Sequence, residues 1–179
     1  MPDILRLSCI KGGTSVLADA YLPAGQLTQD QAGFAFHWGV LLQLADELQD
    51  LTDDLQRGSV TLFSLAVKRE PLDALTNRLL HFAERVLSRA DCLGSSSPEL
   101  RDLLRRSCRS LLLCAVGDAS AFYTPAYLRH LETFSPVRFD FLQKNRDRIS
   151  ITGALGDDLF RALLDDPVVC NGTRTATVL

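Results

Sequence analysis

Four charged residues share one face of a helix predicted in the first third of the chain. The segment 46–58 reads DELQDLTDDLQRG, and at about 100° per residue one narrow stripe of the helix holds Asp46, Asp50, Asp53 and Arg57. Like charges one turn apart repel by about 0.2–0.5 kcal/mol per pair, so a stripe of three aspartates costs stability unless a cation binds it. Mg²⁺ is the natural candidate, because it prefers carboxylate oxygens and completes its shell with water and phosphate.

A plain amphipathic helix is the alternative interpretation of the same segment. Leucines at spacings of three and four lie opposite the aspartates: Leu41, Leu44, Leu48, Leu51 and Leu55. Such a helix is apolar inside and acidic outside, and a run of charge is usually solvated. Toward the N-terminus, however, the acidic stripe continues into the small and apolar residues Leu42, Gly39 and Ala35. This continuation favours a charged mouth above an apolar cavity.

The remaining segments are predicted to be helical, so the expected fold class is all-α, a bundle of about seven helices. The predicted helices cover residues 11–22, 28–58, 61–69, 71–93, 98–117 and 155–164, with shorter ones opening at Thr124-Pro125 and Ser135-Pro136. Thr28 and Gln31 form a capping box, and Gly58 suits a helix end. We expect a single helical domain over residues 1–166 and an irregular tail over residues 167–179.

Composition excludes several classes of protein. The chain has 179 residues, of which 46% are hydrophobic and 23% charged, as in a globular domain. Its net charge of −3 argues against a nucleic-acid partner. The five cysteines form no CxxC pair, which indicates reduced thiols and a cytoplasmic protein. We expect no membrane span and no signal peptide, since neither sequence pattern occurs.

The acidic helix and its flanks resemble the second acidic motif of class I isoprenoid synthases. The run from Asp46 to Asp50 resembles the DDxxD motif of trans-prenyl diphosphate synthases, with Glu47 at its second position. Residues 39–44 resemble the GxxFQI lead-in of those enzymes, and Lys11 resembles their diphosphate-binding lysine. The same stretch is similar to the squalene and phytoene synthase pattern, at Gln43, Leu44, Asp50, Asp54, Gly58 and Leu62. The resemblance covers residues 11–64 and is closest to the bacterial class I isoprenoid biosynthesis enzymes.

This resemblance implies a Mg²⁺-dependent site for an isoprenyl diphosphate, used in prenyl transfer or terpene synthesis. The implied metal ligands are Asp46, Asp50 and Asp54, with Asp53 a weaker candidate. The implied diphosphate ligands are Lys11 and Arg57. The isoprenyl cavity would be lined by Ala35, Gly39, Leu42 and Gln43. No catalytic residue is assigned, and Glu47 is not expected to bind the metal because it lies well round the helix from Asp50.

The family also has a first acidic motif on an earlier helix, and nothing before Lys11 can supply it. The chain therefore resembles only the C-terminal half of a synthase, and we expect a homodimer or a complementary N-terminal half as partner. The pairs Asp157-Asp158 and Asp165-Asp166 are interpreted as solvated helix-end charges. The alternative function is a non-catalytic helical protein, a degenerate half that binds a partner or an apolar ligand.

Simpler interpretations of single residues stay open. An equally good interpretation of Lys11 is a surface lysine ahead of a Gly-Gly turn. An equally good interpretation of Arg57 is a cation at a helix C-terminus, where the helix dipole favours positive charge. The histidines His37, His81 and His130 lack zinc-ligand spacing, and His37 is interpreted as a packed side chain. The segment 11–14 lacks the pattern of a phosphate loop. A basic ridge at helical spacing, interpreted as a solvated face, is formed by Arg101, Arg105 and Arg109.

Overall fold

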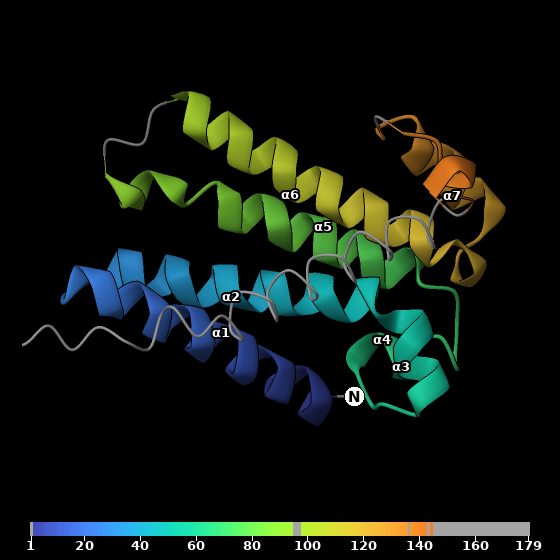
Figure 1. The fold of residues 1–179 in the computed structure, drawn as a ribbon, viewed down its shortest axis with the longest axis horizontal. Coiled ribbons are helices and arrows are strands. Elements are labelled where there is room, and N and C mark those ends of the chain that lie inside the picture. The colour runs from blue at the N-terminus through green and yellow to red at the C-terminus, as the bar shows by residue number, and fades with distance from the viewer. Residues whose placement is uncertain (1, 95–97, 136, 143, 145–179) are drawn as a thin grey trace, which may run out of the picture. The chain divides into compact units, whose positions relative to one another are not determined.

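Helices make up all the regular secondary structure that the structure describes. It is a computed structural model and describes residues 2–94, 98–135, 137–142 and 144, which contain no strand, so the all-α class is confirmed. The helices are α1 (Pro2–Ala24), α2 (Gln29–Gln49), α3 (Leu51–Arg57), α4 (Leu62–Ala66), α5 (Asp73–Leu87), η1 (Ala90–Leu93), α6 (Pro98–Asp118), η2 (Ser120–Phe122) and α7 (Pro125–Glu132). The four long helices α1, α2, α5 and α6 run side by side in alternating directions (Figure 1).

Helix α1 is longer than the sequence pattern predicts. It begins at Pro2, nine residues before the predicted start at Lys11, and Gly25 follows it with φ +67°. Gly12 and Gly13 therefore lie in the middle of the helix, and not in a turn. Each interior glycine costs about 1 kcal/mol relative to alanine, so tertiary contacts must offset this cost.

The acidic segment forms two consecutive helices, α2 and α3, where one was predicted. The predicted capping box is present, since the Thr28 side chain accepts from the Gln31 backbone and the Gln31 side chain accepts from Thr28 N–H. The predicted end at Gly58 is also confirmed, with φ +70°. The break falls at Asp50, but the backbone N–H of Asp50 still bonds the carbonyl of Asp46 at 2.8 Å. The two helices therefore follow one another with little interruption.

A helical turn and a long helix follow. Thr61 caps α4 in a capping box with Ser64, next to the predicted start, but α4 ends at Ala66 and not at residue 69 as predicted. Pro71 is not the first residue of α5, which begins at Asp73. The backbone N–H of Leu72, just before the helix, bonds the carbonyl of Phe122. The side chain of Asp73 then accepts hydrogen bonds from both the backbone and the hydroxyl of Thr124. This contact joins the start of α5 to the start of α7.

Two of the later helices, α6 and α7, begin at their predicted signals, whereas Pro136 of the predicted Ser135-Pro136 start lies outside the described residues. Pro98 opens α6, and Thr124 caps α7 with Pro125 at its first turn. The chain divides into a compact unit, Met1–Gln143, and a second unit, Lys144–Leu179. The predicted helix at 155–164, the predicted domain boundary after residue 166, the tail at 167–179 and Cys170 all lie outside the described residues. As for membranes, no described helix combines the length and apolarity that a bilayer span needs.

The core is built from the leucine stripe of α2 and the helices around it. Four of the five predicted stripe residues are buried, Leu41, Leu44, Leu48 and Leu51, and only Leu55 is half-buried. Other fully buried side chains are Phe63, Leu72, Leu112 and Val116. Burial of such a side chain contributes about 1.5–3 kcal/mol. The stripe thus fixes which face of α2 turns inward and which presents the aspartates.

Candidate functional site

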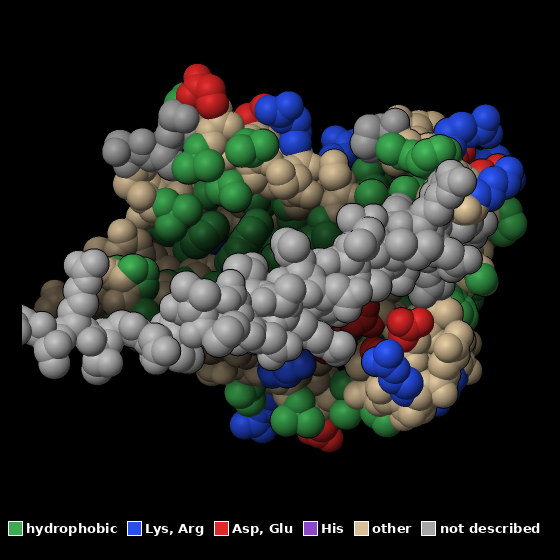
Figure 2. Space-filling view, viewed as in Figure 1, with side chains coloured by type: hydrophobic (Ala, Val, Ile, Leu, Met, Phe, Trp, Pro, Cys, Tyr) green, Lys and Arg blue, Asp and Glu red, His purple; other side chains and the backbone are tan. Residues whose placement is uncertain are grey.

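A polar cleft of about 460 Å³ lies where the start of α1 meets the end of α2. It contains five residues singled out from the sequence: Lys11, Gln43, Asp46, Asp50 and Asp54. Acidic side chains gather over the junction of α2 and α3 in the space-filling view (Figure 2). The volume falls within the range of about 300–1,000 Å³ that is usual for small-molecule sites. The structure therefore brings most of the predicted polar residues to one place.

The position of Lys11 follows from a close crossing of α1 and α2. A Cβ atom on Gly12 would lie 2.5 Å from the carbonyl oxygen of Gly39, so only glycine fits there. A Cβ atom on the neighbouring Gly13 would meet the ring of Phe36, a side chain. Because the helices approach this closely, Lys11 shares one cleft with the acidic face of α2.

The carboxylates of the cleft outnumber its cations. Lys11 lines the cleft together with Asp46, Glu47, Asp50 and Asp54. Partial burial raises the pKa of Asp50 above its ordinary value, and the negative charges of Asp46, Asp54 and Asp53 raise it further. A raised pKa means that the charged form of Asp50 is disfavoured, so a bound cation would stabilise it. The cleft is thus an unfavourable place for an anion unless a cation binds with it.

Glu47 has a structural position in the cleft wall. Its side chain is buried, and one carboxylate oxygen accepts a hydrogen bond of 3.1 Å from the backbone N–H of Leu62. The other oxygen accepts a 3.4 Å contact from the side-chain amide of Gln43. Leu62 is the first residue of α4, whose N–H groups have no partner inside the helix. Glu47 therefore joins α2 to α4 with the oxygens that a metal would otherwise use.

The donor set of the cleft fits Mg²⁺ in chemistry. Hard carboxylate oxygens suit this ion, which usually takes one or two from the protein and the rest from water and phosphate. Across the described part of the chain, no group of three or more His, Cys, Asp or Glu side chains is drawn together to hold a metal. Asp46, Asp50 and Asp54 therefore line one cleft without forming a closed cage. One or two of them could bind an ion that a phosphate ligand brings.

Arg57 does not line the cleft with the other predicted residues. It is exposed in the last turn of α3, the position at which a helix dipole favours a cation. Its charge nevertheless lowers the pKa of Asp50, although burial and the neighbouring aspartates raise that pKa by more. Arg57 therefore acts on the cleft through its electrostatic field, and its role toward a diphosphate stays a prediction.

The residues predicted to line an isoprenyl cavity are dispersed. Ala35 is buried, and Leu42 is 37% exposed. A Cβ atom on Gly39 would collide with the carbonyl oxygen of Gly12 and lie 2.8 Å from Cβ of Val16. Helix α1 thus occupies the space beside Gly39, and an apolar chain could reach Gly39 only if α1 moved. Only Gln43 of this predicted set lies in the polar cleft.

Several cleft residues have no counterpart among the predicted ones. Helix α1 supplies Ile4, Leu7 and Ser8, and the segment before α4 supplies Val60 and Thr61. Helical spacing could have indicated that the residues of α1 share a face with Lys11, since Ile4 and Ser8 lie seven and three residues before it. Val60 and Thr61 reach the cleft through tertiary contacts alone.

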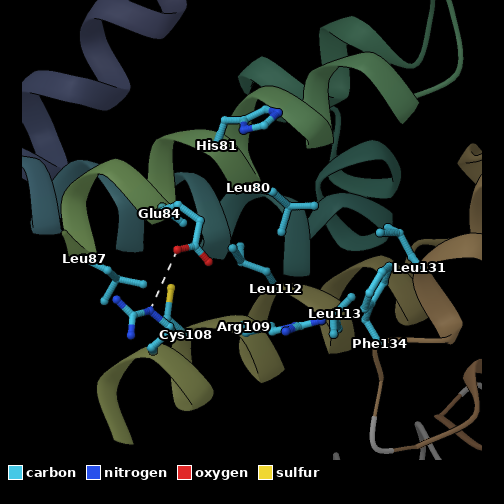
Figure 3. Close-up of a pocket in the computed structure, with 12 residues that line it drawn as sticks. Leu80, His81, Glu84, Leu87, Cys108, Arg109, Leu112, Leu113, Leu131 and Phe134 are labelled. Atoms are coloured by element: carbon cyan, nitrogen blue, oxygen red, sulfur yellow. Dashed lines mark ion pairs between the residues drawn. The ribbon is translucent and has the colours of Figure 1, made fainter. Parts of the chain in front are cut away.

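A different cleft, of about 320 Å³, lies between α5 and α6 (Figure 3). Most of the side chains that line it are hydrophobic. Its floor includes Leu80, Leu112 and Leu113. Burial raises the pKa of the Cys108 thiol in this cleft to about 11, so at neutral pH it is not a thiolate nucleophile. The cleft offers apolar surface and no catalytic arrangement.

The basic ridge of α6 is engaged in contacts within the chain. Arg101 pairs with Asp91, the guanidinium of Arg105 lies 3.9 Å from Glu84, and that of Arg109 lies 5.0 Å from the ring centre of Phe134. These groups remain largely solvent-accessible, so the contacts contribute little to stability. The three arginines of the ridge therefore lie at the surface, and each contacts a side chain of this chain.

His37 and the cysteines agree with their structural interpretations. The Nδ1 atom of His37 lies 2.6 Å from the carbonyl oxygen of Gly33, and its ring contacts Phe36 and Phe82. His37 is therefore a packed side chain. The four cysteines within the described ranges, Cys9, Cys92, Cys108 and Cys114, are all free thiols.

Comparison with protein-family models, with curated proteins and with solved structures found no match for this chain. The chemistry of the polar cleft is therefore the basis for the proposed function.

Proposed function

We propose that the chain binds an isoprenyl diphosphate together with Mg²⁺ in the polar cleft, in the manner of a class I isoprenoid synthase. The observation that carries the proposal is the meeting of Lys11 with Asp46, Asp50 and Asp54. Lys11 comes from α1 and the aspartates from α2, α3 and the residue between them, and the resemblance to the synthases assigns diphosphate to the lysine and Mg²⁺ to the aspartates.

The charge balance of the cleft supports a joint site for metal and diphosphate. A diphosphate alone would meet more carboxylates than cations and would be repelled. Mg²⁺ held by Asp46 and Asp50 would offset the charge of these two carboxylates and bind the diphosphate itself, and Asp54 would contribute directly or through water. Lys11 would then donate to a diphosphate oxygen as a charge-assisted hydrogen bond. Diphosphate binding should therefore depend strongly on Mg²⁺.

The reaction proposed for this site is ionisation of the diphosphate ester for prenyl transfer or terpene synthesis. Bound Mg²⁺ offsets the charge of the leaving diphosphate. The chain's own residues hold and orient the diphosphate end. A second acidic helix would have to come from a second copy of this chain or from a complementary chain, and turnover would then require that partner.

Paired substitutions test this function by calorimetric titration of Mg²⁺ and farnesyl thiodiphosphate. The double variant Asp46→Asn/Asp50→Asn should reduce the enhancement of diphosphate affinity by Mg²⁺ from more than about tenfold to nearly none, because the carboxylates that hold Mg²⁺ are lost. The control Asp53→Asn removes a charge from the same acidic run but lies outside the cleft lining. An unchanged enhancement in the double variant would refute the site.

Lys11→Gln tests the other half of the site. It should weaken Mg²⁺-supported diphosphate binding by about tenfold, the usual size for one charge-assisted hydrogen bond at a partly exposed position. Lys68→Gln, an exposed lysine outside this cleft, is the matched control. Equal losses in both variants would mean that only net charge matters.

A further inference from the structure

A separate, almost wholly apolar cleft of about 460 Å³ lies among α1, α2, α4 and α5. Its lining includes Leu5 of α1, Leu44 of α2, Phe63 of α4, and Leu79 and Phe82 of α5. None of these residues lines the polar cleft described above. A space of this size that stays open to one side can take a small-molecule ligand.

Arg78 is the single charged residue in the lining of this apolar cleft. It is exposed, and it has neither an ion pair nor a hydrogen bond within the described ranges, in contrast to Arg101 and Arg105 of α6. No carboxylate shares the lining. A lone guanidinium beside apolar walls favours an anionic group attached to an apolar body.

The form of the ligand follows from these two features. The apolar walls stabilise a hydrocarbon chain in proportion to the area that it buries. The planar guanidinium forms two parallel hydrogen bonds with a carboxylate. The absence of any second charged group from the lining favours a singly charged head over a metal-bound diphosphate, which the polar cleft suits better.

We infer that this cleft binds a single-chain anionic amphiphile of the fatty-acid class. The carboxylate lies on Arg78, and the alkyl chain lies against Leu5, Phe63, Leu79 and Phe82. The site requires no metal. It is independent of the diphosphate site, so either proposal can fail without the other.

Isothermal titration with dodecanoate below its micellar concentration tests the inference. One dodecanoate should bind per chain, with the same affinity with or without Mg²⁺. Decanoate should bind about tenfold more weakly, because each CH₂ group contributes about fourfold to affinity when it is buried. Dodecyltrimethylammonium, with the same chain and the opposite charge, should also bind at least about tenfold more weakly.

Variants separate the apolar cleft from non-specific binding of detergent. Arg78→Gln should weaken dodecanoate binding by about tenfold, whereas Arg85→Gln, an exposed arginine of the same helix outside the lining, should not. Leu5→Trp, at a position 39% exposed, should fill the mouth and reduce binding, with Ile10→Trp on the same helix as its control. Circular dichroism confirms that each variant is folded.

Three results would overturn the inference. They are equal affinity for the cationic and anionic amphiphiles, equal effects of Arg78→Gln and Arg85→Gln, and binding that requires Mg²⁺ and is lost in Asp46→Asn/Asp50→Asn. The last result would place the ligand in the polar cleft.

Discussion

Gly12 of α1 and Gly39 of α2 contact each other through their backbones at the point where the two helices cross. A Cβ atom on Gly12 would lie 2.5 Å from the carbonyl oxygen of Gly39. Lys11 is next to Gly12, and Gln43 is one turn after Gly39, and both line the polar cleft. The crossing of two glycines therefore sets the distance at which the cation of α1 faces the acidic end of α2.

The first prediction concerns this crossing. Gly39→Ala should lower the free energy of unfolding by about 1–3 kcal/mol, because the added methyl group would force the helices apart. Gly33 lies in the same helix, and a methyl group there would meet nothing within 4 Å, so Gly33→Ala should raise stability by up to about 1 kcal/mol. Urea unfolding of both variants measures the difference. A stable Gly39→Ala protein would contradict the close approach.

The second prediction concerns Glu47. Glu47→Ala should destabilise the protein by about 1–3 kcal/mol, because the buried N–H of Leu62 would lose its acceptor. Glu47→Gln retains an acceptor oxygen and should cost less. Denaturant midpoints compare the two variants. If Glu47→Ala were neutral in stability but abolished Mg²⁺ binding, Glu47 would be a metal ligand and the structural assignment would be wrong.

The third prediction is a pH dependence at Asp50. Because its pKa in the folded state is raised above the ordinary 3.8, its protonated form favours folding, and this contribution is lost as pH rises through the raised pKa. Asp50→Asn should therefore be more stable than the wild type at pH 7, by about 0.2–0.5 kcal/mol per like-charge neighbour. The advantage should disappear below the ordinary pKa.

Thermal unfolding from about pH 2.5 to 7 spans both sides of the ordinary pKa and follows this difference, with Asp19→Asn of α1, outside the acidic run, as the control. A constant offset between Asp50→Asn and wild type across the whole range would show that the charges of Asp46, Asp53 and Asp54 are not its cause.

The fourth prediction concerns the hydrogen bond between Thr76 and Tyr123, whose hydroxyl oxygens lie 2.7 Å apart in the core. Tyr123→Phe should cost about 1–3 kcal/mol, because the fully buried Thr76 hydroxyl would lose its partner. Tyr127→Phe removes an exposed hydrogen bond to Asn77 and should cost less. Equal losses would indicate that the two bonds are equally solvated, contrary to the burial of Thr76.

Helix ends with local signals were predictable from the sequence. Thr28 with Gln31, Thr61 with Ser64, and Thr124 with Pro125 each satisfy their own helix start, so no distant residue is needed. Leucine spacing likewise predicted the buried face of α2, which Leu41 and Leu48 confirm. Because this face of α2 is buried, the aspartates on the opposite face point toward the solvent.

Tertiary contacts decided the features that the sequence did not predict. The two glycines at 12 and 13 weaken a helix locally, yet α1 runs through them because only glycine permits the crossing with α2. The same crossing closes the face of Gly39 that was expected to be open. Pro71 was a wrong prediction for the first residue of α5, and the backbone N–H of Leu72, beside it, bonds Phe122, a residue far along the chain.

The cleft itself was predicted only in part. Helical spacing placed Asp46, Asp50 and Asp53 on one stripe, and of these only Asp46 and Asp50 line the cleft. Asp54 and Lys11, which also line it, came from the resemblance to isoprenoid synthases. Glu47 joins α2 to α4 only because residues 58–61 bring the N–H of Leu62 to its carboxylate. The position of Glu47 in the predicted helix did not indicate this contact.

The most direct test of the diphosphate site is a thermal-shift titration of the intact chain with Mg²⁺, with farnesyl thiodiphosphate, and with both. We expect a rise in Tm mainly when both are present, since the cleft repels the anion without the metal. At about a hundred times Kd the stabilisation should reach about 2.7 kcal/mol. An equal rise with the diphosphate alone, or no rise with both together, would contradict a joint site for metal and diphosphate.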